Sequence, residues 1–442
     1  MARVWIAVLS SPDPVPLDPA VASALDRAID ERAEDAFGFL ERLVAAPSPA
    51  GLEMGAQQVV RDELDRLGFL TSVLPIPEDI AADPVAGVPQ QAYAGRGNVI
   101  GHLAAGTGPS LLLNGHIDVV PAEAPLWSAP PFQPVRRDGW LAGRGAGDMK
   151  GGFALAALAL GALQAAVPGW LRGELSFASV IEEECTGNGT LAAARAGVLA
   201  DAAVLLEPTD LGLLLGGVGI LWAEVSVRGL PAHAESAHRA VNPVDSAWRV
   251  IDAVRSLEKE MALQLAGPFA QVDGACAVNV GTFHAGDWPS SVPGQAVLGL
   301  RVGFPPGWTP DEALERVTDA VAVAAAADPW LAEHPPRVRA AGFRAEGYLL
   351  DGGHPLAAAM ARAHQAAHGE PPRQFVLGST TDARIYVNQF GVPALAYGPR
   401  TRNIHATDEA VELDSIVAGA RTLARFLVAY YAGGGLPEGS AL

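Results

Sequence analysis

The chain has 442 residues, half of them hydrophobic, and a formal net charge of -19. This length is too great for one ordinary hydrophobic core and predicts a large domain with a smaller one. The acidic balance, with no run of Lys or Arg longer than a pair, argues against nucleic acid and against an anionic membrane surface as partners.

The composition also predicts the compartment. The apolar run at residues 4–9 is shorter than the core of a signal peptide and is interpreted as an irregular leader. The longest apolar run elsewhere, residues 153–163, is well short of the ~20 residues that span a bilayer. Because Cys185 and Cys276 are too few for a disulfide framework, a reducing compartment and a cytoplasmic location are expected.

Helices and strands are predicted to alternate along most of the chain. Residues 19–45 and 53–68 show the period of amphipathic helices. Buried strands are predicted where short apolar runs end in polar clusters, at residues 110–113, 175–181, 203–206 and 393–397. An Ala-rich helix is expected at residues 150–166. This order indicates an α/β domain with helices on both faces of its sheet.

The pattern changes from residue 217 onward. An alternating strand at 222–227 is followed by a helix at 243–263, strands at 277–282 and 296–302, and a helix at 310–326. This β-α-β-β-α order predicts an inserted α+β open sandwich. The Pro-rich stretch around Pro335 and Pro336 is interpreted as its exit, and a helix at 353–368 as the return to the first domain.

Two of the polar clusters contain a histidine or an aspartate that could bind a metal. His116 and Asp118 form an HxD pair in which the histidine could bind a metal and the aspartate could hold its other ring nitrogen. Asp148 follows closely spaced glycines at a helix start. A phosphate loop is the rival interpretation, but no Gly-Lys-Ser/Thr ends the motif, and a simple N-capping role also stays open.

The remaining clusters add carboxylates and a second histidine. Residues 182–184 are three consecutive glutamates, and on an extended strand Glu183 and Glu184 would point to opposite sides. A solvated acidic turn is the alternative. Glu207 follows the next apolar run, and His405 lies near the C-terminus. Together the clusters offer two histidines and three carboxylates, a ligand set that suits Zn, Co or Mn.

The motifs HxDVVP, GRGxxDMKGG, EEExxGxG, EPT and a late His followed by Asp-Glu occur in this order. The order resembles the M20 metallopeptidase family, in the group of acetylornithine deacetylase, succinyl-diaminopimelate desuccinylase and carboxypeptidase G2. The resemblance implies a mixed-sheet phosphorylase/hydrolase-like catalytic domain at 1–216 and 344–442, and a lid and dimerisation domain at 217–343.

The resemblance also implies residue roles. His116, Asp148 and Glu207 would bind one divalent metal, and Asp148, Glu184 and His405 the other, with Asp148 bridging and its bond to Met149 in cis. Zinc is the expected metal, with Co or Mn as alternatives. The remaining roles would be Glu183 as general base, Asp118 as the residue that orients His116, His233 as a group completing the partner subunit's site in a homodimer, and Arg384 and Asn242 as substrate-binding residues.

Substrate contacts in the lid depart from the family pattern. Where the family usually has Asn-Val-Val-Pro, this chain has Ser290 in the place of the Asn. Where the last lid strand of the family usually has Asp and Arg, this chain has Arg301 and Gly303. The activity expected is removal of a short acyl group, such as acetyl, from a small N-acyl amino acid, for example N-acetylornithine. Alternatives are a dipeptidase or carboxypeptidase, a desuccinylase, a deformylase of a formylaminopyrimidine, and a silent metal-binding relative.

Overall fold

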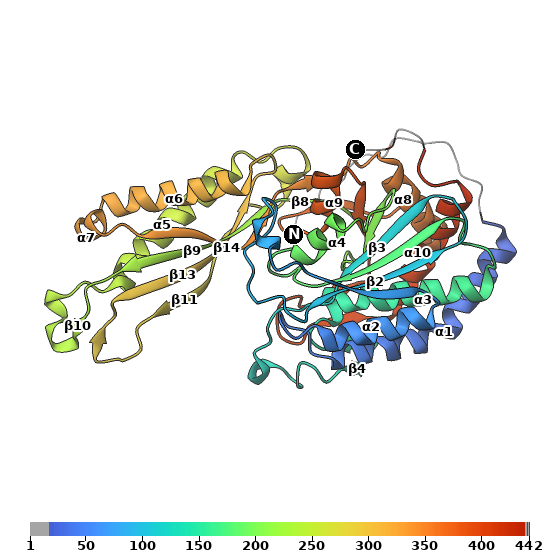
Figure 1. Ribbon diagram of the computed structural model, residues 1–442, viewed down its shortest axis with the longest axis horizontal. Coiled ribbons are helices and arrows are strands. Elements are labelled where there is room, and N and C mark those ends of the chain that lie inside the picture. Colours follow the sequence, from blue (N-terminus) through green and yellow to red (C-terminus); the bar gives the residue numbers. More distant parts are fainter. Residues whose placement is uncertain (1–16, 438–439, 441) are drawn as a thin grey trace.

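The described residues fold around two large hydrophobic cores, with a small third cluster of buried residues where the two units meet (Figure 1). The computed structural model describes residues 17–437, 440 and 442, so the apolar run predicted as a leader lies outside the described residues. One core belongs to a large α/β unit and the other to an elongated α+β unit beside it, here called the lid. The predicted fold class is therefore confirmed. The exact boundaries 217 and 343 stay a prediction.

A nine-stranded mixed sheet forms the centre of the larger unit. The strand order is β1-β2-β6-β3-β7-β17-β8-β15, with β16 beside β8. Strands β6, β3 and β7 run parallel, and β1 and β2 are antiparallel at one edge. The bounds are β1 (Leu70–Pro75), β2 (Gly97–Ala104), β3 (Ser110–His116), β6 (Glu174–Val180), β7 (Ala203–Leu205), β8 (Leu213–Gly217), β15 (Tyr348–Leu349), β16 (Gln374–Leu377) and β17 (Ala394–Ala396).

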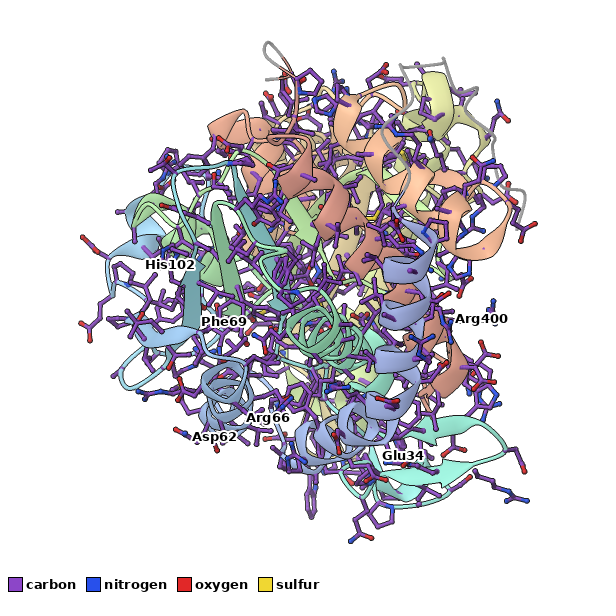
Figure 2. All side chains as sticks on the ribbon, turned by 90° about the vertical axis from the view of Figure 1, so that its right-hand side faces the viewer. Glu34, Asp62, Arg66, Phe69, His102 and Arg400 are labelled. Atoms are coloured by element: carbon purple, nitrogen blue, oxygen red, sulfur yellow. The ribbon has the colours of Figure 1, made fainter. Side chains whose placement is uncertain are left out.

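Helices cover both faces of this sheet, as the alternation predicted. Successive residues of β3 point to opposite faces of the sheet. Asn114 Nδ2 donates to Thr190 and Tyr386 on one face, and Gly115 lies against Phe153 on the other. One layer contains α1 (Pro19–Ala45), α2 (Met54–Arg66), α3 (Gly151–Ala166), α8 (Pro355–His368) and α10 (Leu413–Ala432), and the other contains α4 (Asn188–Arg195) and α9 (Ala383–Phe390). Charged side chains such as Glu34 and Asp62 lie on the outer surface (Figure 2).

One helical stretch of the described chain, Ala146–Ala166, is long and apolar enough to cross a membrane. It comprises the turn Ala146–Lys150 and helix α3, and 78% of its most apolar window is buried inside the protein. Helix α3 packs between α1 and α10. Its apolar character is that of a helix at the centre of the larger core.

The lid contains a four-stranded antiparallel sheet in the order β11-β13-β9-β14. Helices α5 and α6 pack on one another and on the sheet, and the short pair β10 and β12 forms the far end of the lid (Figure 1). The bounds are β9 (Gly219–Arg228), β10 (Ala232–His233), α5 (Pro243–Ala262), β11 (Val278–Ala285), β12 (Ser291–Val292), β13 (Gln295–Phe304), α6 (Pro310–Ala326), α7 (Pro329–Glu333) and β14 (Arg337–Ala345).

The prediction for the end of the lid was wrong in one respect. After Pro335 and Pro336 the chain forms β14, a full strand that pairs with β9 before it returns to the first unit. The pairing of β14 is interrupted between Ala340 and Arg344, and Gly342 lies in this irregularity with φ +86°. A side chain at Gly342 would collide with the Trp222 ring, so the close approach requires glycine.

A second four-stranded sheet lies at the edge of the larger unit. Its order is β18-β19-β5-β4, from β4 (Val135–Arg137), β5 (Trp140–Ala142), β18 (Thr401–Arg402) and β19 (Ala410–Glu412). The sheet brings the segment before Asp148 next to the segment that carries His405. Two regions far apart in the sequence therefore meet beside the ends of the central strands.

The buried His364 of α8, which lies beside the half-buried His368, predicts how stability depends on pH. His364 Nδ1 lies 2.9 Å from Tyr397 Oη, and burial, assisted by the nearby His368, lowers the pKa of His364 to about 4. An unfolded histidine titrates near pH 6.5, so the unfolded chain binds the proton first. Stability from this group is present above pH ~6.5 and lost as the pH falls towards 4.

The melting temperature of the wild-type protein is therefore expected to fall between pH 6.5 and 4, partly through His364. His364→Gln should make this decline shallower, and His102→Gln, at the exposed His102 of β2 (Figure 2), should leave it unchanged. Differential scanning fluorimetry across this range measures both slopes. An unaltered slope in His364→Gln would contradict the assignment.

Candidate metal centre

The ends of three parallel strands present polar side chains at one edge of the central sheet. His116 is the last residue of β3, Glu183 and Glu184 follow β6, and Glu207 follows β7. The carboxyl ends of neighbouring parallel strands open on the same side, which is where α/β sheets place ligands. Asp148 joins them from the turn before α3 and His405 from the loop after β18.

Asp148 lies between the two histidines. Its Oδ1 is 3.0 Å from His116 Nε2, and its Oδ2 is 3.4 Å from His405 Nε2. His405 Nε2 is also 3.0 Å from Glu184 Oε2. One ligand atom each from His116, Asp148 and Glu184 lie within 4.8 Å of one another, close enough to hold a cation. The carboxylate of Asp148 therefore faces both halves of the cluster.

Glu183 and Glu207 complete the group beside His116. Glu207 Oε2 lies 3.9 Å and Glu183 Oε2 lies 4.0 Å from His116 Nε2. The structure thus brings together all five predicted metal ligands and the predicted base. Figure 1 places these strand ends at the side of the sheet that faces the lid.

Asp118 supports the site in a different way from the one expected. His116 Nδ1 lies 2.9 Å from the main-chain carbonyl oxygen of Asp118, whereas the carboxylate is 3.7 Å away. The carboxylate instead accepts hydrogen bonds from the main-chain N–H groups of Glu183 and Glu184, at 3.2 and 3.1 Å. Asp118 therefore fixes the ring through its backbone and the glutamate turn through its side chain.

Glu409 is a supporting residue that the sequence analysis named only as part of a motif. Its Oε1 accepts hydrogen bonds from the N–H groups of Gly147 and Asp148, at 2.8 and 2.9 Å. Its other oxygen is paired with the buried Arg144. The Asp148–Met149 peptide bond is cis, as the resemblance implied. Glu409 thus holds the backbone that presents Asp148.

Burial and the crowding of carboxylates shift the pKa values of the cluster in the direction that favours a bound proton or cation. Burial raises the pKa of Glu207 to about 8 and that of Glu183 well above its usual range. Burial alone would lower the pKa of His405, but Glu184 and Asp148 raise it to about 11. Because neighbouring carboxylates repel one another in a buried site, each favours protons or another cation nearby. The donor set therefore fits divalent metal ions.

The two predicted site residues of the lid lie away from this cluster. His233 is exposed at the end of β10, and its Nδ1 accepts a hydrogen bond from the N–H of Glu235 at 3.2 Å. Asn242 caps α5, with its Oδ1 accepting from the N–H of Val244 at 3.1 Å. Figure 1 shows β10 at the end of the lid farthest from the central sheet. Within one chain, His233 is not brought to the metal ligands.

Arg384 is buried and bonded to protein groups. Its guanidinium donates to the carbonyl oxygens of Thr381 and Thr186, at 3.0 and 3.1 Å, and lies 3.3 Å from Asp382 Oδ1. Asp382 is itself buried and also accepts from Thr190 Oγ1 at 2.6 Å. A role for Arg384 in binding a substrate carboxylate stays a prediction, and while these contacts last it would have to use Nε and the remaining Nη2 hydrogen.

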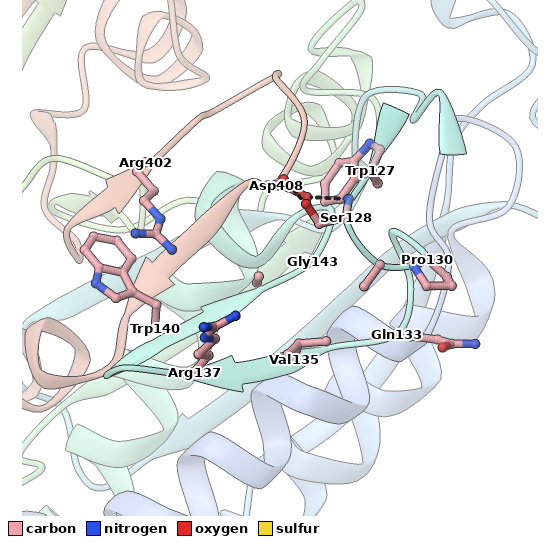
Figure 3. Close-up of a pocket in the computed structure, with 12 residues that line it drawn as sticks. Trp127, Ser128, Pro130, Gln133, Val135, Arg137, Trp140, Gly143, Arg402 and Asp408 are labelled. Carbon is pink, nitrogen blue, oxygen red and sulfur yellow. Dashed lines mark hydrogen bonds between the residues drawn. The ribbon is translucent and has the colours of Figure 1, made fainter. Parts of the chain in front are cut away.

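A surface pocket of about 300 Å³ is lined in part by Arg402 and Asp408, which flank His405 in the sequence (Figure 3). Trp127 and Trp140 line it, with the Arg402 guanidinium over the Trp140 ring at 4.3 Å. Asp408 accepts hydrogen bonds from the N–H and the hydroxyl of Ser128, at 2.9 and 2.7 Å. This contact anchors the far side of the loop that carries His405.

A model of the Peptidase family M20/M25/M40 matches residues 112–429, which is more than half of the chain and includes every predicted metal ligand. The chain belongs to this family. It is a metal-dependent M20 amidohydrolase with a candidate metal site.

Relatives with known activities cover almost the whole chain. It is 27% identical to an N-formyl-4-amino-5-aminomethyl-2-methylpyrimidine deformylase of Bacillus subtilis, over 92% of this chain and 97% of the relative. It is 32% identical to a succinyl-diaminopimelate desuccinylase of a Methylobacterium species, over 87% and 96%. These relatives all act on amide bonds.

Solved structures share the fold at low sequence identity. Human carnosine dipeptidase 1 superposes with a TM-score of 0.75 and 16% identity, over 94% of this chain and 99% of that one. A dinuclear metal binding peptidase of the M20 family from Bacillus subtilis superposes with a TM-score of 0.57 and 15% identity, over 91% and 99%. Both likenesses concern the fold alone, a large α/β unit with a smaller α+β unit beside it.

Proposed function

We propose that this M20 enzyme hydrolyses the formamide, or a similarly short acyl amide, of a small amine that lacks a carboxylate next to the amide. The observation that carries this choice is that Arg384, the arginine expected to bind a carboxylate, already donates from Nη1 and Nη2 to Thr381, Asp382 and Thr186. The likeness to the formylaminopyrimidine deformylase along both chains supports it. The comparisons do not favour acetylornithine as the substrate.

Two divalent metal ions, with zinc as the leading choice and Co or Mn as alternatives, fit the nitrogen and oxygen donors of the cluster. His116, Asp148 and Glu207 would hold one ion, and Asp148, Glu184 and His405 the other. When bound, such ions polarise the amide carbonyl and bring the pKa of water down from ~15.7 to about 7. Asp118 and Glu409 keep the ligands in place.

Glu183 would act as the general base. Its carboxylate lies beside His116 and is largely buried, so a proton that it takes from water is retained within the site. The same group would then pass the proton to the nitrogen of the leaving amine. The products are formate, or another short carboxylate, and a free amine.

Desuccinylation is the second candidate activity, and the positively charged guanidinium of Arg301 favours it. Arg301 extends from β13 to the loop after β16, where its Nη2 donates to the carbonyl of Gly378 at 2.9 Å. Burial lowers the pKa of Arg301, and no described carboxylate raises it. A substrate with several carboxylates, like that of the desuccinylase relative, could pair with this guanidinium.

A substrate panel separates the candidates. The purified enzyme is loaded in turn with Zn, Co and Mn and assayed on the formylaminopyrimidine, N-acetylornithine, succinyl-diaminopimelate and a dipeptide. We expect kcat/KM for the formyl amine to exceed the others by at least about tenfold, or ~1.4 kcal/mol in transition-state binding. A preference of that size for succinyl-diaminopimelate would replace the first proposal with the second.

We further propose a cytoplasmic homodimer that associates through the lid and acts on a small molecule. The exposed position of His233 at the far end of the lid supports a role in the partner's site rather than in its own. The two buried free cysteines agree with a reducing compartment.

A further inference from the structure

The turn that carries the proposed base has an unusual backbone. Strand β6 ends at Val180, and Glu182 has φ +62°, a left-handed conformation that long side chains seldom adopt. The carbonyl oxygen of Glu182 accepts hydrogen bonds from the N–H groups of Thr186 and Gly187, at 3.0 and 2.7 Å. Residues 182–187 therefore form a closed turn, and the alternation expected of an extended strand does not apply to them.

The side chain of Glu182 is completely buried, and the partners described for its carboxylate are not metal ligands. Arg96 Nη1 donates to its Oε1 at 2.8 Å, and Tyr93 Oη and Thr186 Oγ1 donate to its Oε2 at 2.7 and 2.9 Å. Arg96 is also paired with Glu53, which is completely buried at the start of α2. One guanidinium thus binds two carboxylates inside the protein.

Two sets of contacts hold this turn, one to its main chain from Asp118 and one to the side chain of Glu182 from Arg96. The Asp118 carboxylate accepts the N–H groups of Glu183 and Glu184, and Arg96 fixes the residue just before them. A residue forced into a left-handed conformation persists only when its surroundings over-determine it. Removing the contact between Arg96 and Glu182 would let the turn relax and move both Glu183 and Glu184.

We propose that Glu182 and Arg96 are positioning residues that set the directions of Glu183 and Glu184 at the metal centre. The inference rests on the proposed function for the catalytic part, but its effect on metal binding does not. Because positioned groups lose activity steeply when displaced by about 1 Å, the network should affect kcat far more than KM.

Glu182→Gln is the decisive variant, because it keeps the shape of the side chain and removes its charge. We expect kcat on the best amide of the panel to fall about tenfold to a hundredfold, with KM changed less than about twofold. In the protein loaded with Co²⁺, the visible absorption spectrum should change and the affinity for one ion should fall about tenfold, since Glu184 is displaced.

Asp26→Asn is the matched control. Asp26 of α1 makes a bidentate pair with the largely buried Arg425 of α10, at 2.9 and 2.8 Å, away from the metal ligands. This variant should lower the melting temperature and leave the cobalt spectrum and kcat unchanged. The comparison distinguishes the general effect of losing an ion pair from the effect of losing the pair between Glu182 and Arg96.

Arg96→Lys carries the same test if Glu182→Gln fails to fold, because a lysine keeps the charge but cannot bind both carboxylates with a planar fork. A changed cobalt spectrum in either variant supports the positioning role, even if no amide on the panel is hydrolysed. A lowered melting temperature with an unchanged spectrum and unchanged cobalt affinity would overturn it. Absence of hydrolysis in the wild-type protein would instead count against the proposed function alone.

Discussion

Glu183→Gln is expected to lower kcat by at least about 10²-fold while both metal ions stay bound. The amide of glutamine has nearly the same shape as the carboxylate but cannot accept a proton from water or return it to the leaving amine. Steady-state kinetics measures the loss, and metal analysis of the dialysed protein measures retention.

Glu184→Gln provides the contrast within the same turn. Glu184 Oε2 contacts His405, so its loss should weaken one metal ion, and added metal should restore part of the activity. Glu183→Gln should not respond to added metal. If the two variants behaved in the opposite way, the roles of base and ligand would be exchanged between these neighbours.

Mixing two inactive variants, Glu183→Ala and His233→Ala, is expected to restore hydrolysis. In a dimer that contains one chain of each kind, the site on the His233→Ala chain keeps its own Glu183 and receives an intact His233 from its partner. The exposed place of His233 at the end of the lid is the reason to expect this exchange. Hydrolysis is measured after the two proteins are unfolded and refolded together.

Each variant refolded alone should remain inactive, and subunit exchange should be verified with differently tagged chains. If His233 acted within its own chain, every site in a mixed dimer would keep one lesion. Mixed dimers that form but do not hydrolyse the substrate would therefore exclude the shared site, and a monomer in solution would exclude it as well.

The central strands and their attached ligands could be predicted because both depend on local sequence. The apolar runs before His116 and Glu207 are short and end abruptly in polar residues, which is how a buried parallel strand ends at its ligand-binding edge. The order of the motifs then indicated which polar residues converge. The structure brings these residues together, and their individual roles as metal ligands stay a prediction.

The contacts that support the ligands could not be predicted in the same way. Strand β14 pairs with β9 across more than a hundred residues, so no short pattern reveals it. Glu182 resembles its two neighbours in sequence, and the contacts that fix its carboxylate come from Arg96, Tyr93 and Thr186, which no local pattern connects with it. The resemblance implies that Arg384 binds substrate, but its burial depends on how the loop around Thr186 folds.

The close packing at Gly342 links the position of the lid to the glutamate turn. Gly342 lies against the carbonyl of Cys185, and its own carbonyl accepts a hydrogen bond from the N–H of Val88 at 2.8 Å. The preceding Gly87 lies against Thr186 so tightly that a side chain there would collide with it. These contacts join the lid strand β14 directly to the turn that carries Glu183 and Glu184. A change in the position of this strand would therefore be passed to the backbone of the two glutamates.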